Sequence, residues 1–490
     1  MELQPVGSSY KRMKEDHGTF SDAPVISTTE SSVDHANFTV EDAVETIGFG
    51  KFQLKLFVLC GIFTASDAME MLLLAVLGPV LRCEWLLEEV QVAFITTAVF
   101  IGMFLGAPGW GKCGDTYGRW PMLLLVGLWI SFFGFLSSFS PVYGWILVLR
   151  ALVGFGIGGA SQAFTILAEY LPRKHRAKTL IIYHIFWATG SCFEIILAMA
   201  VVPTKGWRWL AALSAIPLGV SCFFFYFIPE SARYLMAAGD REKAMKILRE
   251  AAKLNNAELP SGELQKSPVL ARGKFADIFS AEYRRTTFQI WPIWFGIAFS
   301  YYGIILASSE ILEFHKSCTG SGTEVIQTEQ GCHCNPLGHA DYITMIWSSL
   351  GEFLGLPINL FLMDLIGRQK TLAVSLVGTG VFFLLIQLCV SRGVLTFFLF
   401  GARALSSAVF NTVYIYTTEV YPTTVRALGL GSSSAMARLG AMSTPFISQV
   451  LLNASLVSAL WVYGAIAFLC AIDALLLPIE TRGRAMAQST

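Results

Sequence analysis

Long apolar stretches alternate with short polar connections through most of this chain. About 20 apolar residues are enough to cross a bilayer as a helix, and twelve such stretches can be recognised. A polar segment at 229–286 separates the first six from the last six. The pattern predicts an all-α membrane protein with twelve transmembrane helices in two bundles of six. They are expected near residues 54–81, 90–110, 120–139, 144–168, 179–202, 207–228, 287–312, 341–364, 370–390, 393–418, 427–452 and 456–478.

The composition supports a polytopic membrane protein. Of the 490 residues, 54% are hydrophobic and 14% are charged, an apolar excess too large for an ordinary soluble enzyme. The sequence shows no basic patch suited to nucleic acid, no phosphate-binding motif of the form G-x-x-x-x-G-K-[ST] and no hydrolytic triad. We therefore expect a protein that is not an enzyme, needs no cofactor or metal, and does not use ATP directly.

The basic residues predict the orientation, because short cytoplasmic loops collect Lys and Arg. Such residues follow the second, fourth, eighth and twelfth predicted helices, so both termini are expected to be cytoplasmic, in a vesicle or the plasma membrane. Residues 1–50 show no hydrophobic core of a signal peptide. Apolar residues at helical spacing in 38–52 predict an amphipathic helix on the inner membrane surface. The alternative is a disordered tail.

Motifs recur in the two halves of the chain. The frame Asp-x-x-Gly-Arg occurs at 115–119 and 364–368, an offset of 364 − 115 = 249 residues. Three more repeats keep the order: Arg-Ala-Leu at 150–152 and 403–405, Glu-x-x-Pro-x-x-x-Arg at 169–176 and 419–426, and Pro-Glu-Ser at 229–231 with Pro-x-Glu-Thr at 478–481. Duplicated helix bundles are typical of secondary transporters, since two halves can rock about a site between them. We expect a tail (1–50), a first bundle (51–228), a cytoplasmic loop (229–286), a second bundle (287–478) and a tail (479–490).

The repeated loop motifs are candidates for a cytoplasmic gate. Asp115 is placed at the start of the third helix, where unpaired amides and the helix dipole favour an anion. Gly118 allows a tight turn there. These groups can form charge networks that close in one conformation and open in another; the alternative is that they only set topology and cap helices. The gate candidates are Asp115, Gly118, Arg119, Glu169, Arg176, Asp364, Gly367, Arg368, Glu419 and Arg426.

These loops resemble the signature loops of the major facilitator superfamily, whose twelve-helix members transport by alternating access. The Arg that usually follows the Asp is missing, because Thr116 and Leu365 stand there. Pro-Glu-Ser-Ala-Arg-Tyr-Leu at 229–235 resembles the end of the sixth helix of sugar porters and organic-ion transporters. Asp-Ala-Met-Glu-Met at 67–71 resembles the synaptic-vesicle-two-related branch. Other sugar-porter residues are not found, which disfavours a hexose carrier.

A set of four acids and three bases falls inside predicted helices, where a charge costs about 2.5–3.5 kcal/mol to insert. Asp67 and Glu70 are three residues apart and should face the same way. Two close carboxylates in a poorly solvated cavity do not both ionise readily, so one should carry a proton near neutral pH. We expect Asp67 to pair with Arg150, and protonation of this group, which includes Glu70, to couple a proton to transport. A static ion pair and direct contact with substrate are the alternatives.

The other charges of the set, with aromatic residues of the seventh helix, are candidates for contact with substrate. Ala-Arg-Leu-Gly at 437–440 resembles the eleventh helix of organic-ion carriers, where a basic residue is typical of anion carriers. Arg438 could therefore dock a carboxylate, unless neighbouring acids neutralise it. Aromatic rings could stack on a planar or cationic ligand, although they also fill cores. The candidates are Glu194, Tyr301, Tyr302, Glu352, Arg403 and Arg438, and Trp187 is a weaker one.

Cysteines on the predicted outer side could form a disulfide. They are Cys83 and, after the seventh helix, Cys318, Cys332 and Cys334, whereas Cys389 is interpreted as an apolar residue within a helix.

The sequence thus predicts a monomeric secondary active transporter of a small organic ion, with anions favoured and proton coupling expected. Symport and antiport both stay open. Its partners are the solute, protons and the lipid bilayer. The competing prediction is a transporter-shaped receptor or vesicle trafficking protein that moves no solute, because a fold does not fix a function. The central charges favour transport, and the missing loop Arg mildly favours the alternative.

Overall fold

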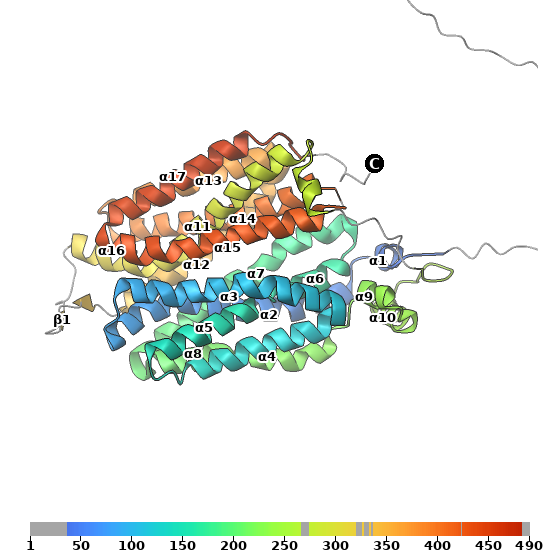
Figure 1. Cartoon of the computed structure of the whole chain (residues 1–490), viewed down its shortest axis with the longest axis horizontal. Coiled ribbons are helices and arrows are strands. Elements are labelled where there is room, and N and C mark those ends of the chain that lie inside the picture. The colour runs from blue at the N-terminus through green and yellow to red at the C-terminus, as the bar shows by residue number, and fades with distance from the viewer. Residues whose placement is uncertain are drawn as a thin grey trace, which may run out of the picture.

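The computed structural model of this chain describes residues 37–265, 274–319, 326–327, 333–334, 337–422 and 424–482. Its long helices form two bundles that lie side by side, α2–α8 and α11–α17 (Figure 1). The end that carries α1, α9 and α10 is here called the inner end, predicted to be cytoplasmic, and the opposite end is the outer end. The all-α prediction is confirmed, and the described strands, β1 (Ile326–Gln327) and β2 (His333–Cys334), have two residues each.

The first bundle follows the predicted spans, except that a turn at 158–160 divides the fourth span into two helices. Its elements are α2 (Lys51–Trp85), α3 (Glu89–Tyr117), α4 (Arg119–Ser137), α5 (Tyr143–Ile157), α6 (Ser161–Glu169), α7 (Arg173–Lys205), α8 (Trp207–Phe224) and the 3-10 helix η1 (Phe225–Phe227). Small residues bring α3 and α5 together: a Cβ added to Gly102 would lie 2.1 Å from the carbonyl oxygen of Ala151. Such close backbone approach is a common way to pack helices in a membrane.

The second bundle repeats this arrangement. Its elements are α11 (Arg284–Thr319), α12 (His339–Ile366), α13 (Arg368–Ile386), α14 (Arg392–Val420), α15 (Arg426–Pro445), the π-helix η3 (Phe446–Leu451), α16 (Leu452–Ala454) and α17 (Leu456–Leu475). In the described chain, eleven helices are long and apolar enough to cross a membrane, and α15 is not one of them. α15 contains Ser432, Ser433, Ser434 and Arg438, and it packs against α11 and against α3 of the first bundle. α15 is therefore the remaining one of the twelve predicted helices, and it faces protein more than lipid.

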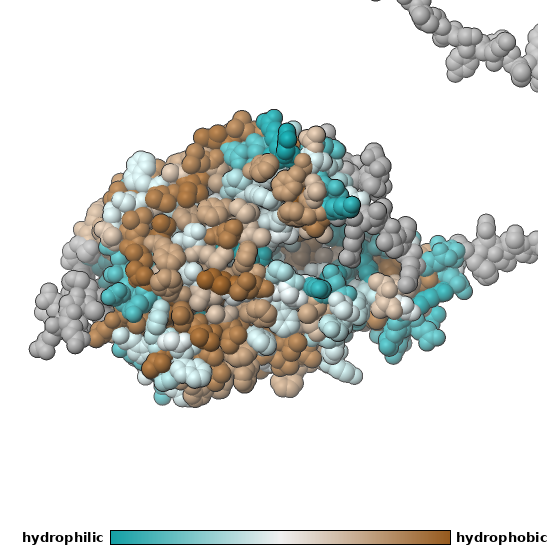
Figure 2. Space-filling view, viewed as in Figure 1, coloured by the Kyte–Doolittle hydropathy of each residue, from teal (hydrophilic) through white to brown (hydrophobic). Residues whose placement is uncertain are grey.

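Large apolar side chains cover the outside of both bundles (Figure 2). Phe132, Phe223 and Phe361 are examples, and Phe223 is 80% exposed. A soluble protein rarely exposes so much contiguous apolar surface. The surface therefore fits a hydrocarbon environment.

A small helical group covers the inner end of the first bundle. It consists of α1 (Val40–Ile47), α9 (Ala232–Ala238), α10 (Arg241–Asn255) and, near the second bundle, the 3-10 helix η2 (Phe275–Phe279). The amphipathic helix predicted within 38–52 is present as α1. Its apolar face is buried and α1 packs against α10, so the predicted position on the membrane surface is wrong.

Candidate functional site

A buried ion pair lies inside the first bundle. Arg150 Nη1 of α5 donates to Glu70 Oε2 of α2 at 2.9 Å, and Arg150 Nη2 donates to Ser137 Oγ of α4 at 2.5 Å. The exposed fractions of the Arg150 and Glu70 side chains are 1% and 0%. The predicted pair between Asp67 and Arg150 is therefore wrong. Although Asp67 and Glu70 are three residues apart, it is Glu70 that turns into its own bundle, where its carboxylate packs against Gly134 of α4.

Asp67 is buried without a described partner. Its side chain is 6% exposed, and Oδ1 has no hydrogen-bond partner among the described residues. Tyr302 of α11, in the second bundle, lies within electrostatic range of Asp67. A buried carboxylate without a donor is costly while it is ionised. Asp67 is thus suited to carry a proton or to meet a donor from a ligand.

Glu194 of α7 also lies in the interior of the first bundle. It is fully buried, and its two carboxylate oxygens are 2.9 and 2.8 Å from Ser214 Oγ of α8. The charged groups within electrostatic range of it are Glu70 and Arg150. The structure therefore does not bring Glu194 together with the other substrate-binding candidates.

A chain of hydrogen bonds joins the two bundles near their middle. Trp187 Nε1 of α7 donates to the Tyr301 hydroxyl of α11 at 2.6 Å, and this hydroxyl donates to Glu352 Oε1 of α12 at 3.2 Å. The same carboxylate oxygen lies 3.0 and 2.8 Å from Nε and Nη2 of Arg403 of α14. The structure thus brings together Tyr301, Glu352 and Arg403, and it connects them to Trp187 of the other bundle.

Arg438 of α15 differs from the other two membrane-embedded arginines, because no described carboxylate pairs with it. Its Nη1 donates to the carbonyl oxygen and Oγ of Ser434 at 3.1 and 2.8 Å. Its Nε is buried and has no hydrogen-bond partner within the described part of the chain. The phenol groups of Tyr302 and Tyr414 lie within electrostatic range. A half-buried guanidinium without a carboxylate partner can bind an anionic ligand.

At the inner end of the first bundle, the repeated motifs form one network. Arg119 Nε lies 3.0 Å from Glu169 Oε1, and Arg119 Nη2 lies 3.3 Å from Asp115 Oδ1. Ser231 donates its hydroxyl to Glu169. The carboxylate of Glu230 accepts hydrogen bonds from the amides that begin α4, including that of Arg119 at 3.0 Å.

The second bundle repeats the network. Arg368 Nε and Nη2 donate to the two oxygens of Glu419 at 3.0 Å each, and Thr481 donates to the same carboxylate at 2.5 Å. Glu480 accepts from the amides of Arg368 and Gln369 at 3.0 Å each. Asp364 of α12 is not among the ion-paired residues of the described chain.

The helix starts next to these networks correct one prediction. Asp115 lies in the last turn of α3, which ends at Tyr117, and so does not begin the next helix as predicted. Glu230 binds the first amides of α4 instead. Gly118 and Gly367 have φ of +108° and +88°, which favour glycine, and the predicted tight turn is confirmed. A Cβ at Gly118 would lie 2.3 Å from Glu230 Oε2.

Arg176 and Arg426 take equivalent positions outside these networks. Each donates to a carbonyl oxygen five residues earlier, Arg176 to Leu171 at 2.9 Å and Arg426 to Tyr421 at 3.2 Å. Both charge networks stay within their own bundles, and no ion pair between described residues joins the two bundles at the inner end. Their function in gating stays a prediction.

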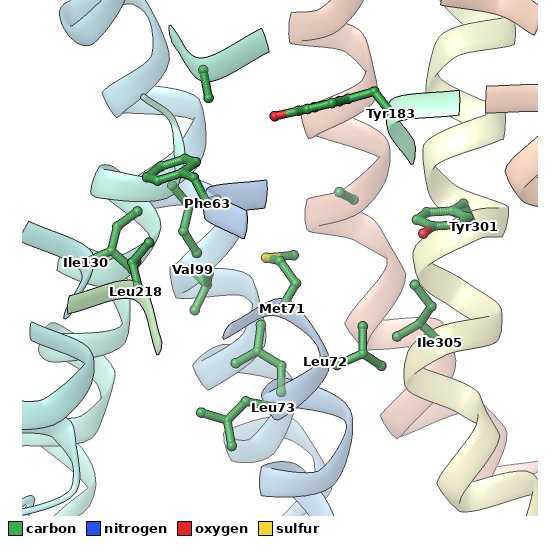
Figure 3. Close-up of a cluster of buried hydrophobic side chains, with 14 of the residues drawn as sticks. Phe63, Met71, Leu72, Leu73, Val99, Ile130, Tyr183, Leu218, Tyr301 and Ile305 are labelled. Carbon is green, nitrogen blue, oxygen red and sulfur yellow. The ribbon is translucent and has the colours of Figure 1, made fainter. Parts of the chain in front are cut away.

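Ion pairs do join the bundles at the outer end. Arg82 of α2 places Nη1 3.2 Å from Glu310 Oε2 and Nη2 3.1 Å from Glu313 Oε2, and both acids belong to α11. Closer to the centre, the buried side chains of Leu72 and Ile305 approach each other between α2 and α11 (Figure 3). In this conformation an apolar layer and a charged layer close the outer end.

Toward the inner end the bundles meet through apolar side chains, such as Ile181 of α7 with Met363 of α12. The surface is hollowed between the bundles toward this end (Figure 2). A ring contact between Phe164 of α6 and Tyr414 of α14, with centroids 5.7 Å apart, crosses the gap. A site between the bundles would thus be reached from the inner end in this conformation.

Disulfides occur where the outer loops meet the helices. Cys318, at the end of α11, is bonded to Cys389, which follows α13. The interpretation of Cys389 as an apolar residue within a helix is therefore wrong. Cys83 is also disulfide-bonded, whereas Cys332 is outside the described residues.

A family model described as sugar (and other) transporter matches residues 25–489. The chain belongs to this family. Two relatives are the synaptic vesicle 2-related protein of Xenopus laevis, 45% identical over 491 residues and covering 100% of this chain and 89% of its own, and SVOPL of Homo sapiens, 46% identical over 459 residues and covering 92% and 93%. These findings confirm the predicted membership of the major facilitator superfamily and its synaptic-vesicle-two-related branch.

Solved structures support the fold. The inward-open conformation of the xylose transporter XylE from E. coli aligns with a TM-score of 0.66 at 15% identity, over 89% of this chain and 98% of that one. A crystal structure of a D-xylose-proton symporter aligns with a TM-score of 0.64 at 16% identity, over 89% and 100%. At such identities the likeness shows the fold alone.

Several residues that form contacts of the site in the structure had no function predicted from the sequence. Glu230 and Glu480 belong to a repeat that was recognised, but their function as helix caps needed the spatial arrangement. Arg82 could have been noticed as a basic residue in an acidic outer segment. Ser214 gave no signal in sequence. Among the described residues, no group of three or more His, Cys, Asp or Glu side chains is placed to hold a metal ion.

Proposed function

We propose that this protein is a proton-coupled secondary active transporter of a small organic anion that works by alternating access. The observation that carries the proposal is the guanidinium of Arg438, which lies in a helix at the bundle interface and has no described acid partner. Placing an arginine inside a membrane is costly, so an unpaired one requires a compensating interaction. An anionic solute supplies that interaction.

The second bundle provides the anion site. A carboxylate can take two parallel hydrogen bonds from Arg438, while Tyr302 and Tyr414 offer hydroxyl groups and ring faces beside it. Arg403 serves differently, because Glu352 already neutralises it and Tyr301 joins this pair to Trp187 of the first bundle. This chain of hydrogen bonds holds the bundles together at the depth of the solute.

The first bundle provides the proton site. Asp67 binds the coupling proton, and the ion pair of Glu70 and Arg150 lies one turn farther along α2. An ionised Asp67 in a closed interface is unfavourable, so the bundles close more readily once it is protonated. The networks of Arg119 with Glu169 and Arg368 with Glu419 keep the inner helix ends rigid while the bundles rock. The protein is proposed to lie in a vesicle or plasma membrane, with cytoplasmic termini.

The test is uptake into proteoliposomes of benzoate, salicylate and succinate, with tetraethylammonium as the cationic control, with and without an inward proton gradient. We expect uptake of at least one acid, stimulated by the gradient, and no uptake of the cation. Arg438→Gln should abolish it, whereas Leu439→Ala, on the neighbouring exposed position, should not.

Proton coupling is tested in the same vesicles. Asp67→Asn should lose the stimulation by the gradient, and Asp473→Asn, another acid within a membrane helix, should keep it. Gradient-stimulated uptake that persists in Asp67→Asn refutes the coupling site. Absence of flux for every solute, together with specific binding of a protein partner, would favour the receptor or trafficking alternative.

A further inference from the structure

The contact between Glu194 and Ser214 constrains where protons can be. Ser214 Oγ is 2.9 and 2.8 Å from the two oxygens of Glu194, and 2.8 Å from the carbonyl oxygen of Leu210 one turn earlier in α8. A serine hydroxyl has a single proton to donate, but it can also accept. If Ser214 donates to Leu210, its contact with Glu194 is a hydrogen bond only when Glu194 supplies the proton.

The surrounding charges favour that arrangement. Glu194 is fully buried, and the cation within electrostatic range, Arg150, is already paired with Glu70. The ion pair of the second bundle lies near Cys192, on the opposite face of α7. An ionised carboxylate without a cation in such a place is strongly unfavourable. One added proton makes the group of Glu70, Glu194 and Arg150 neutral.

Glu70 offers a second place for the same proton. Its Oε2 accepts from Arg150, while its Oε1 is buried and has no described hydrogen-bond partner. That oxygen is therefore free to carry a hydrogen atom. Two nearby carboxylates that share one proton titrate as a pair rather than singly.

We propose that Glu194 is a second proton-binding residue of the first bundle, protonated in this conformation and donating to Ser214. The proton is shared with Glu70 over the transport cycle: in this conformation Glu194 is the acid and Glu70 is ionised beside Arg150, and in another conformation Glu70 is the acid and Glu194 is ionised. Both states contain the same atoms and the same total charge. The use of this proton in transport rests on the proton-coupled function proposed above. The protonation of Glu194 does not depend on that function.

The first experiment reads that protonation without any solute. Infrared spectra of the full chain in lipid nanodiscs are recorded for the wild type and for Glu194→Gln, because a protonated carboxyl has a carbonyl band of its own. We expect one acid band to disappear in Glu194→Gln and to persist in Asp67→Asn. In Ser214→Ala that band should shift toward the position of an acid without a hydrogen-bond acceptor. Identical acid bands in the wild type and Glu194→Gln, with both proteins folded by thermal unfolding, overturn the proposal.

The second experiment tests the use of the proton, with benzoate as the solute. Glu194→Gln should lose the part of uptake that the proton gradient stimulates, while exchange of benzoate at equal pH on both sides continues. Gradient-stimulated uptake equal to that of the wild type shows that the proton does not move and overturns the proposed sharing. If the wild type itself transports none of the solutes, the proposed function fails, and the infrared bands still decide whether Glu194 is protonated.

Discussion

Replacing Arg82 by glutamine should open the outer end of the protein. Arg82 is the described residue that forms ion pairs between the bundles there, with Glu310 and Glu313. Glutamine removes the positive charge and leaves two carboxylates close together. Repulsion between them and loss of both ion pairs act in the same direction, against the closed outer end.

The magnitude follows from the burial of these groups. The exposed fractions are 13% for the Arg82 side chain, 4% for Glu310 and 28% for Glu313, so solvent screens the second pair more than the first. A hydrogen bond to a charged group contributes about 1.5–3 kcal/mol. Counting the Glu310 contact in full and that of Glu313 at about half gives roughly 2–4 kcal/mol, which is a shift of at least about 30-fold toward the outward-open state.

Spin labels on the two bundles can measure this shift. Cysteines introduced at Val90 and Val457, exposed at the outer starts of α3 and α17, report the distance between the bundles. Arg82→Gln should add a longer distance to the distribution. Arg208→Gln is the matched control, since its ion pair with Glu84 lies within the first bundle. A distribution for Arg82→Gln that coincides with the wild type would refute the idea that these ion pairs hold the outer end closed.

Three further predictions concern the inner end. Gly118→Ala should lower the unfolding temperature, because the positive φ at this position costs an alanine about 1–2 kcal/mol and its Cβ displaces Glu230. Gly111→Ala, with open space around it, should leave the unfolding temperature unchanged. Asn255→Ala should speed hydrogen exchange in α1, because the Asn255 side chain joins α10 to the end of α1 and to the start of α2; unchanged exchange would show that other contacts alone hold this junction. Hydrogen bonds from Thr39 lower the pKa of Asp42 below 3.8, so the protection of α1 should be complete at neutral pH and fall as acid protonates Asp42. Asp42→Asn should remove that pH dependence, and a dependence that remains would exclude Asp42 as its source.

The fold could be predicted from sequence because hydrocarbon imposes one requirement on every span. Backbone groups must be satisfied within the helix, so apolar runs of sufficient length mark helices wherever they occur. α15 shows where that signal weakens, since its serines and Arg438 make it too polar for a simple hydropathy threshold. A helix was still predicted at 427–452, because most residues of that stretch are apolar.

The site was harder to predict, because helical spacing does not say which neighbour a side chain meets. By helical spacing Asp67 and Glu70 lie on the same side of α2, yet it is Glu70 that forms the ion pair with Arg150. That choice depends on Gly134 of α4, whose missing side chain makes room for the Glu70 carboxylate. Likewise, Glu194 has the residue type of a substrate ligand, but its position on α7 turns it toward α8. Partners of this kind follow from packing between helices, which one sequence does not encode locally.

The membrane-embedded charges divide unequally between the bundles, and this division bears on the proposed mechanism. Among the seven charges predicted to lie inside the helices, the first bundle has an excess of acids and the second an excess of bases: Asp67, Glu70 and Glu194 with Arg150, against Glu352 with Arg403 and Arg438. An excess of acids stores protons, and an excess of bases attracts an anion. With Glu194 protonated as proposed above, one further proton on Asp67 makes the first bundle neutral, and one monovalent anion beside Arg438 does the same for the second. Closure of the bundles then requires both ligands, because either one alone leaves an uncompensated charge in a dry interface. In the proposed mechanism, strict coupling of proton and anion thus follows from desolvation, without a direct contact between the two sites.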